Sequence, residues 1–182
     1  MLFRSLRVHA DTRQAIVFTL KTRPDGKLGP GLKRTSPECE RQLDERTRTG
    51  APIPAPPMPS GPQPRIEPVC GRTMGMMNAR TGAETYASGG RPFSDLVSTL
   101  SGTLKAPVID QTGLAGLFDV LLEFESTRAF AGRPPGPDLN STDPLPVPLP
   151  TALQQQLGLT LEKGTGPLPI TIIDAAEPPS PN

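Results

Sequence analysis

The sequence has few large aromatic side chains from which a core could be built. Its 182 residues include no Trp, one Tyr and six Phe, and hydrophobic residues make up 35% of the chain. Because the stability of a domain grows with the apolar surface that folding removes from water, this composition favours folded units of roughly 90 residues over one of full length. The composition therefore excludes a large enzyme.

Histidine and cysteine are also scarce, which limits catalytic and metal chemistry. The single histidine, His9, has no plausible nucleophile near it in the sequence, so a histidine-dependent hydrolase is not expected. Two cysteines are too few for a structural zinc site unless His9 and an acidic residue join them. We therefore expect no enzyme activity, no catalytic residue, no cofactor and no metal site.

Long apolar runs are absent too. No stretch approaches the 18 or so apolar residues of a membrane span, and residues 1–7 lack the apolar run of a signal peptide. The first 50 residues are basic, but five of their Lys and Arg lie in two strand-like runs with only Phe3 and Phe18 as aromatic neighbours: Arg4, Arg7, Arg13, Lys21 and Arg23. Nucleic-acid binding favours basic residues gathered on one face. We expect no membrane insertion in this chain and no nucleic-acid partner.

Proline is abundant, and its distribution divides the chain. Of the 25 prolines, eight lie in residues 51–68 and seven in residues 133–150. Proline-rich segments are extended spacers, whereas the rest of the chain has an ordinary proline content. The sequence therefore predicts ordered pieces joined by two proline-rich spacers.

The two cysteines, Cys39 and Cys70, flank the first of these spacers. Free thiols at the ends of a spacer would be exposed and oxidisable, so we predict a disulfide between them. In the chain-entropy model such a bridge contributes roughly 3 to 4 kcal/mol. The predicted disulfide in turn indicates an oxidising compartment. The alternative is a pair of unrelated thiols in the cytosol.

The first third of the chain predicts a β-hairpin followed by a short helix. Residues 2–9 and 14–21 form two strand-like runs around a polar turn at 10–13. Ser36 is a good N-cap residue and the proline after it suits the first helical position, which predicts a helix to about Arg46. This helix is polar and marginal alone.

The middle of the chain predicts alternating strands and one clear helix. We expect a short strand at 85–87 and a helix at 93–104, where apolar residues recur at helical spacing. A short strand at 107–110 and a turn at 111–116 follow. Residues 118–124 alternate between apolar and mostly acidic side chains, which predicts a strand with one buried face.

The C-terminal part repeats the strand pattern of the N-terminal part. Leucines at helical spacing predict a helix at 149–157, which Gly158 would end in a left-handed conformation. A second hairpin is expected from strands at 159–161 and 168–174. Because only this copy has a helix before its hairpin, we infer two αββ units, the first of which is incomplete in this chain.

One turn carries the most motif-like residues of the sequence. They are Asp110, Thr112, Gly113, Gly116 and Asp119, and two carboxylates around a glycine turn could bind a cation or a ligand. The simpler interpretation is structural, because Asp and Thr bond local amides in turns and glycine supplies positive φ. We keep these five residues as a weak candidate binding site.

Three methionines form a second candidate. Met74, Met76 and Met77 could ligate copper(I) in an oxidising compartment. No histidine lies near them, and Cys70 is the sole nearby cysteine, so apolar filler is the favoured interpretation.

Several segments resemble one protein family. The run 107–119, which contains Asp-x-Thr-Gly-Leu-x-Gly-x-Phe-Asp, together with 153–162 and 172–182, resembles the C-terminal part of a large uncharacterised family known mainly from acidobacterial genomes. Residues 6–33 resemble its preceding segment. Family members are often exported or fused behind a membrane sensor-transducer metallopeptidase of the kind that responds to beta-lactams. The resemblance implies a periplasmic or secreted, N-terminally truncated member and supplies no catalytic residue.

The order of elements predicts an α+β fold. A small sheet with two short helices on one face is similar to the short N-terminal domain of secretins and TonB-dependent receptors, which binds partner proteins. An N-terminal β-hairpin and proline-rich linkers complete the expected fold, and we expect the hairpin to add strands to a single sheet formed by residues 118–124 and 170–173.

Four segments follow from this interpretation. We expect a hairpin remnant at 1–35, a disulfide-braced linker at 36–83, an α+β module at 84–175 interrupted by a loop at 126–148, and a disordered tail at 176–182. The expected function is a non-catalytic extracytoplasmic binding or sensory module with a protein partner. The alternative is an accessory part of a hydrolase or peptidase whose catalytic portion lies outside this chain.

Overall fold

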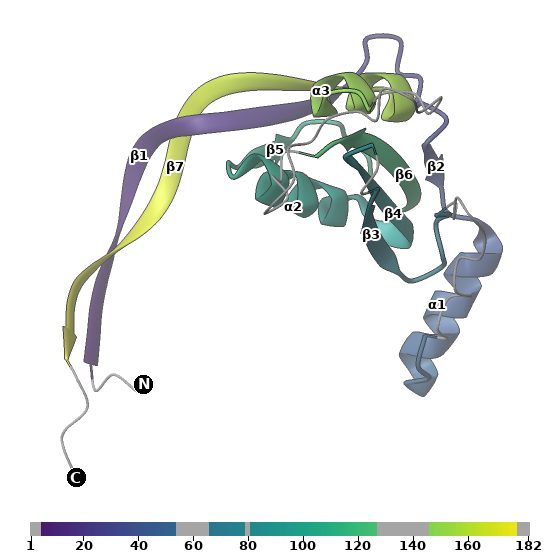
Figure 1. The fold of residues 1–182 in the computed structure, drawn as a ribbon. Helices are drawn as coiled ribbons and strands as arrows, with labels where there is room; N and C mark the ends of the chain where they lie inside the picture. The colour runs from purple at the N-terminus through teal and green to yellow at the C-terminus, as the bar shows by residue number, and fades with distance from the viewer. Residues whose placement is uncertain (1–4, 54–65, 79–80, 127–145, 178–182) are drawn as a thin grey trace.

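A computed structural model describes residues 5–53, 66–78, 81–126 and 146–177 (Figure 1). Within these residues the fold is mixed α+β, with two sheets and three short helices. The α+β class is thus confirmed. A long two-stranded ribbon extends from one side of a small core, with Ser5 paired to Glu177 at its far end.

The ribbon belongs to a three-stranded sheet of order β5-β1-β7. Strand β1 (Ser5–Thr22) pairs along its whole length with the antiparallel strand β7 (Leu159–Glu177). Strand β5 (Val108–Asp110) runs parallel to β1 and covers only its core end, at Phe18–Leu20. Beyond that point the sheet is two strands wide.

Both expected hairpins are therefore wrong. Residues 10–13 continue β1 without a turn, because a tight hairpin needs positive φ at its centre and none of these four residues is Gly or Asn. Residues 163–166 include two glycines but also stay extended, since Gly164 pairs with Val17 and Gly166 with Ala15. The N-terminal segment does pair with 170–173, as expected, but as one long strand.

The second sheet has the order β2-β6-β4-β3 and is antiparallel throughout. Its strands are β2 (Leu32–Arg34), β6 (Leu117–Glu125), β4 (Ala83–Pro92) and β3 (Thr73–Met77). The strand predicted at 118–124 lies here, apart from 170–173, so the expected single sheet is wrong. Its alternation is confirmed, because one face of β6 is buried throughout: Phe118, Val120, Leu122 and Phe124.

Three helices complete the fold, and each begins or ends with the residues that the sequence indicates. Helix α1 (Pro37–Thr49) is capped by Ser36, whose hydroxyl accepts from the Cys39 amide. Helix α2 (Phe93–Leu104) follows β4. Helix α3 (Leu149–Ala152) continues into a π-helical turn, η1 (Leu153–Leu157). Gly158 ends it with a φ of 72°.

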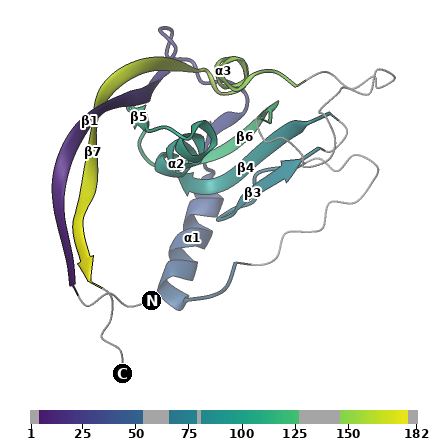
Figure 2. The same ribbon diagram turned by 60° about the vertical axis from the view of Figure 1, so that its left-hand side comes forward.

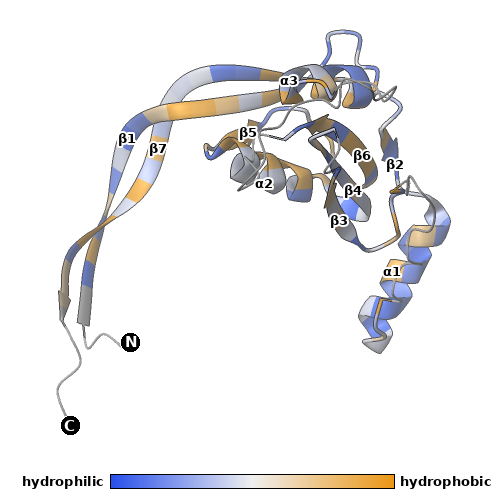
Figure 3. Ribbon diagram, viewed as in Figure 1, coloured by the Kyte–Doolittle hydropathy of each residue, from blue (hydrophilic) through white to orange (hydrophobic). Residues whose placement is uncertain are grey.

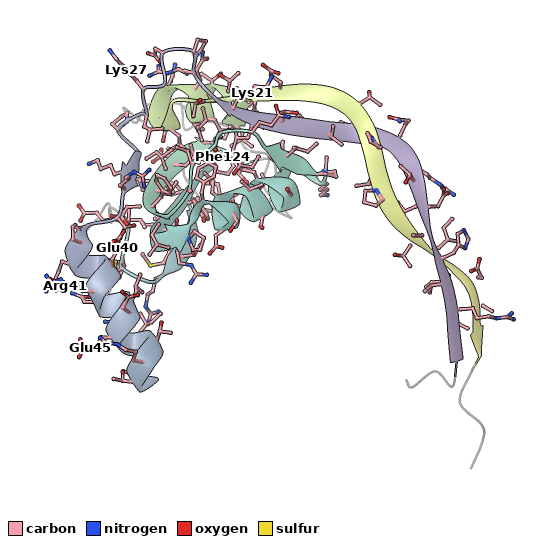
Figure 4. All side chains as sticks on the ribbon, turned by 180° about the vertical axis from the view of Figure 1, so that it is seen from behind. Lys21, Lys27, Glu40, Arg41, Glu45 and Phe124 are labelled. Atoms are coloured by element: carbon pink, nitrogen blue, oxygen red, sulfur yellow. A yellow bond between two sulfur atoms is a disulfide. The ribbon has the colours of Figure 1, made fainter. Side chains whose placement is uncertain are left out.

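One apolar core joins both sheets to α2 and α3. Figure 3 shows the apolar residues gathered between these elements, whereas α1 is largely polar. Seen from behind in Figure 4, Phe124 lies among the core side chains while Glu40, Arg41 and Glu45 of α1 project outward. The least exposed core residues come from both sheets and both helices: Leu20, Leu32, Leu96, Phe118, Leu122, Leu153, Leu157 and Leu159.

Two of the expected segment descriptions need correction. The segment 36–83 contains the expected helix, α1, but also strand β3, so the part after the helix is not a spacer throughout. Strand β7 reaches Glu177, so the first two residues of the expected tail are in a strand. The proline-rich residues 54–65, most of the loop 126–148, and 178–182 lie outside the described residues.

Candidate functional site

The turn after β5 holds its shape through its own side chains. The Asp110 carboxylate accepts from the amide of Thr112 at 2.8 Å and from its hydroxyl at 2.7 Å. The Thr112 hydroxyl in turn accepts from the Leu114 amide at 3.2 Å. Gly113 and Gly116 supply positive φ, 69° and 102°. These contacts are the local turn chemistry that Asp, Thr and Gly provide.

Asp119 lies in the second sheet and makes hydrogen bonds outside the turn. Its Oδ1 accepts from the Thr35 hydroxyl at 3.0 Å and from the Gly90 amide at 2.8 Å. Thr35 is buried beside the start of α1, and Gly90 lies at an irregularity of β4. Asp119 thus ties the segment before α1 to the two central strands.

The five candidate residues therefore divide into two groups. Asp110, Thr112, Gly113 and Gly116 belong to one turn, whereas Asp119 bonds a different part of the fold. Among the described residues no group of three or more His, Cys, Asp and Glu side chains is placed to hold a metal ion. Binding at the turn stays a prediction.

The predicted disulfide is confirmed. Cys39 of α1 and Cys70 are bonded, with Cα atoms 5.7 Å apart. The backbone of Cys70 forms an isolated β-bridge with that of Gly89. A Cβ added to the neighbouring Gly90 would lie 2.8 Å from Cys39 Sγ. The disulfide thus packs directly against Gly90, whereas a Cβ on Gly89 would lie 2.7 Å from the Val69 carbonyl group, so neither position has room for a side chain. A disulfide is typical of oxidising compartments.

The methionines and the histidine are far apart in the topology. The three methionines lie on strand β3 of the second sheet, and Met76 is exposed. His9 lies on the ribbon, where its Nδ1 is 2.9 Å from Oδ1 of Asp174. Asp174 is the extra residue of a bulge, because Val8 pairs with Ile173 and Arg7 with Ala175. The carboxylate of this bulge residue thus contacts the histidine across the ribbon.

The ribbon itself is the most unusual surface of the described chain. Beyond β5 none of the described residues adds a third strand beside these two (Figure 1). Val8, Ile16 and Ile173 are large apolar residues that are 49%, 52% and 62% exposed. A two-stranded ribbon in water is marginal by itself, and exposed apolar side chains commonly mark interaction surfaces.

The two edges of the ribbon differ in what they offer a partner. In antiparallel pairing, residues alternate between those that bond the neighbouring strand and those whose N–H and C=O point outward. The Phe18 amide donates to Pro107 and the Leu20 carbonyl accepts from Gln111, so the even-numbered residues of β1 point away from β7. The register is unbroken from Val8 to Thr22, so this assignment extends along the ribbon.

The outer edge of β7 is protected by proline. Pro169 pairs with Thr12 and Pro167 with Gln14. Since these even-numbered β1 residues point outward, the two prolines also face the outer edge, and the edge lacks N–H donors there. Proline at an edge is a recognised defence against added strands.

The outer edge of β1 is open over a longer stretch. Between Ser5 and Thr22 it contains no proline and no glycine. Its outward N–H and C=O groups belong to five residues in succession: Val8, Ala10, Thr12, Gln14 and Ile16. Among the described residues one of these amides has a partner, since the Thr12 N–H donates to the Asp11 carboxylate at 2.7 Å. In the view of Figure 2, β1 forms the outer rim of the ribbon's lower part.

The edge of β6 that faces away from β4 is covered, in contrast to the outer edge of β1. Strand β2 pairs with β6 at Phe118–Val120. Further along, the Gln156 side chain accepts from the Glu123 amide at 2.8 Å and donates to its carbonyl at 2.6 Å. One amide side chain thus replaces a neighbouring strand at β6, whereas nothing equivalent is described at β1.

The open edge was missed by the expectation of a hairpin. Eighteen residues without Gly or Pro, from Ser5 to Thr22, are the signal that could have revealed one long strand in place of the hairpin, because a chain without turn residues continues its strand. The paired prolines at 167 and 169 are a second signal, since proline in a strand marks an outer edge.

Comparison with known proteins shows the family of this chain. The model of the family described as Protein of unknown function (DUF3738) matches residues 4–176, so the chain belongs to that family. The match includes all of β1 and β7 except Glu177, the last residue of β7. No curated protein and no solved structure matches the chain. No helix in the described ranges is long and apolar enough to cross a membrane.

Proposed function

From membership of DUF3738 and the open edge of β1, we propose that this chain is a non-catalytic binding module of an extracytoplasmic compartment, periplasmic or secreted. Its partner is a protein that adds an extended strand to β1 from Val8 to Ile16. The observation that carries the proposal is the row of outward N–H and C=O groups on a proline-free edge, next to an edge that prolines protect.

Strand addition suits this edge for a physical reason. A strand that aligns beside β1 satisfies its unpaired backbone groups and turns the two-stranded part of the ribbon into a wider sheet. The exposed side chains of Val8 and Ile16 lie on one face of that edge and would gain apolar cover. Main-chain bonds supply affinity, and the side chains at alternate positions supply selectivity.

Asp11 restricts which strands can bind. Its carboxylate lies against the outward Thr12 amide and would have to leave it when a strand pairs there. A charge at an edge disfavours generic strand addition. A partner strand with Lys or Arg opposite Asp11 offsets that cost, so the proposed partner carries a basic residue at that position.

The disulfide and the family support the compartment. The bond between Cys39 and Cys70 persists where thiols are not kept reduced. The resemblance to chains that are exported or fused behind membrane sensor-transducer metallopeptidases suggests that the module forms the sensory part of such assemblies.

The test is selection of extended peptides from a displayed random library on the purified, oxidised full chain. We expect the selected peptides to be rich in Lys and Arg and to slow hydrogen exchange at the amides of Ala10 and Gln14. Thr12→Pro removes an outward N–H without breaking a bond to β7, and it should abolish binding. Thr171→Pro is the matched control, because Thr171 pairs with Ala10 and its amide faces the opposite edge.

Either of two results would overturn the proposal. One is selection of peptides that bind equally well to the Thr12→Pro and Thr171→Pro variants, since the β1 edge would then be irrelevant. The other is the failure of any peptide, and of any second copy of the chain, to protect the amides of Ala10 and Gln14.

A further inference from the structure

We propose that the strand that pairs with the open edge of β1 is β1 of a second copy of the chain, related by a two-fold axis at Thr12. This inference rests on the proposed function and names its partner. Over Val8–Ile16 the two copies would form a four-stranded antiparallel sheet of order β7-β1-β1-β7, with the protected β7 edges on the outside. Before Val8 each β1 would turn away at the bulge, because β5 occupies the edge of the other copy from Phe18 onward.

The geometry of the edge limits the possible registers. Only even-numbered residues of β1 present backbone groups outward, so even residues must face even residues across the new interface. Strand β5 occupies the edge from Phe18 onward, and the ribbon has a bulge between Arg7 and Val8. The regular free edge therefore runs from Val8 to Ile16. Its midpoint is Thr12, and a symmetric pair that uses all of it places Thr12 opposite itself.

The register centred on Thr12 pairs the acidic and basic side chains of the edge with each other. It places Asp11 of each copy opposite Arg13 of the other, in pairs whose side chains are close because they do not share backbone bonds. Arg13 has no hydrogen-bond or ion-pair partner among the described residues of its own chain. When the Asp11 carboxylate leaves the Thr12 amide, it therefore meets a cation in the second copy.

The same register gathers the exposed apolar side chains. On the opposite face of the sheet, Val8 of each copy lies directly opposite Ile16 of the other. Ile173 already pairs with Val8 across the ribbon. These three side chains, each about half exposed or more in the single chain, thus form one row across the interface. Cross-strand pairs of β-branched residues stabilise antiparallel sheets.

Neighbouring registers lose these features. Moving the two-fold axis to Asp11 puts the two Asp11 carboxylates opposite each other and His9 opposite Arg13. Moving it to Arg13 puts the two Arg13 side chains opposite each other. Like charges directly opposite destabilise a sheet. The register centred on Thr12 is therefore the one selected by charge complementarity.

The test measures self-association of the full oxidised chain by sedimentation equilibrium, with charge variants that report the register. Asp11→Arg leaves two cations facing each other in each cross-strand pair, and Arg13→Asp leaves two carboxylates. Each variant alone should therefore dissociate at least about tenfold more readily than the wild type. In a mixed dimer, the new arginine at position 11 of one variant faces the new aspartate at position 13 of the other. In the second cross-strand pair, the native Arg13 of the first variant faces the native Asp11 of the second. Both pairs therefore join opposite charges. We expect the mixture to form heterodimers about as tightly as the wild type, which also shows that each variant is folded.

Two backbone variants complete the test. Thr12→Pro should be monomeric, whereas Thr171→Pro should associate like the wild type. A wild-type chain that remains monomeric at every accessible concentration overturns the inference. So does a dimer that survives Thr12→Pro, or a mixture of charge variants that shows no rescue. If the chain is monomeric but displayed peptides still bind at β1, the dimer is wrong and the proposed binding module stands.

Discussion

Asp119 is a motif residue whose hydrogen bonds hold two parts of the fold together. Its carboxylate bonds the Thr35 hydroxyl and the Gly90 amide, two groups with little access to water. Removing an acceptor from buried donors costs more than the bond contributes, because the donors then lack any partner. The residue therefore has a structural role that explains its place in the motif without a ligand.

Asp119→Ala should lower the free energy of unfolding by about 1 to 3 kcal/mol in urea denaturation. Asp119→Asn keeps the Oδ1 acceptor and should recover most of that loss. Asp110→Ala is the matched control in the exposed turn and should cost less than about 1 kcal/mol. Equal losses in the Ala and Asn variants would show that the charge of Asp119, and not its hydrogen bonds, is what matters.

Gly158 is fixed by both its conformation and its neighbours. It has a φ of 72°, and an added Cβ would lie 2.4 Å from the Lys27 carbonyl oxygen and 2.8 Å from the Gly29 nitrogen. The Gly29 amide bonds the Leu157 carbonyl, so the backbones cross here in direct contact. A side chain cannot enter without separating them.

Gly158→Ala should therefore destabilise the chain by more than about 2 kcal/mol, since the left-handed conformation alone costs about 1 to 2 kcal/mol. Gly102 offers the opposite case, because it lies inside α2 with no atom within 4 Å of an added Cβ. Gly102→Ala should raise stability by up to about 1 kcal/mol. Thermal unfolding of both variants measures the contrast, and a destabilised Gly102→Ala would contradict it.

At the scale of elements, α1 depends on the disulfide for its position. The helix is polar, and of its residues Cys39 alone is buried. Leu43 lies close to Gly71 and Gly90, but a helix of 13 residues with so little apolar surface gains little from packing, so we expect its attachment to depend mainly on the disulfide and the Ser36 cap. The disulfide thus holds α1 against the rest of the fold, whereas α2 and α3 are held by their residues in the apolar core.

Replacing both Cys39 and Cys70 with serine should lower the free energy of unfolding by about 3 to 4 kcal/mol. The wild type with dithiothreitol should show the same loss, whereas the serine variant should be indifferent to the reductant. Hydrogen exchange should show α1 as the element that loses protection first. A variant as stable as the oxidised wild type would mean that α1 is held by other contacts.

The elements that the sequence predicts well are those specified by neighbouring residues. The cap at Ser36, the alternation at 118–124 and the stop at Gly158 each depend on residues a few positions apart. The pairing of β1 with β7 joins residues such as Val17 and Gly164, which are distant in sequence. The glycines at 164 and 166 resemble a turn signal, but both lie in the extended strand β7. Gly166 makes room for Val17, whose Cγ2 would lie 3.2 Å from an added Cβ, whereas a Cβ on Gly164 would meet no atom within 4 Å. Tertiary pairing overrides the local preference there.

The candidate site follows the same division. The Asp110 and Thr112 turn was predicted with its structural chemistry because it is local. The open edge of β1 was not, because which backbone groups point outward depends on the registers of β5 and β7 against β1. An edge is a property of the sheet, and the sequence of one strand does not contain it.

At the scale of the whole molecule, the chain consists of one shared core and a ribbon that leaves it. Leu20 and Leu159 are buried in the core, so both ribbon strands are anchored at one end. Toward the other end, Arg7 to Gln14 of β1 are exposed throughout. Burial therefore falls steeply along the same two strands.

This gradient predicts three classes of amide in hydrogen exchange of the monomeric Thr12→Pro chain. Amides in the core, such as that of Leu122, should exchange only by global unfolding. Odd-numbered residues of the outer ribbon, such as His9 and Asp11, bond β7 and should exchange by opening of the ribbon, at least about tenfold faster. Even-numbered residues, such as Ala10 and Gln14, should exchange almost as fast as in an unfolded chain. Outer-ribbon amides as slow as Leu122 would contradict this, because the ribbon would then unfold together with the core.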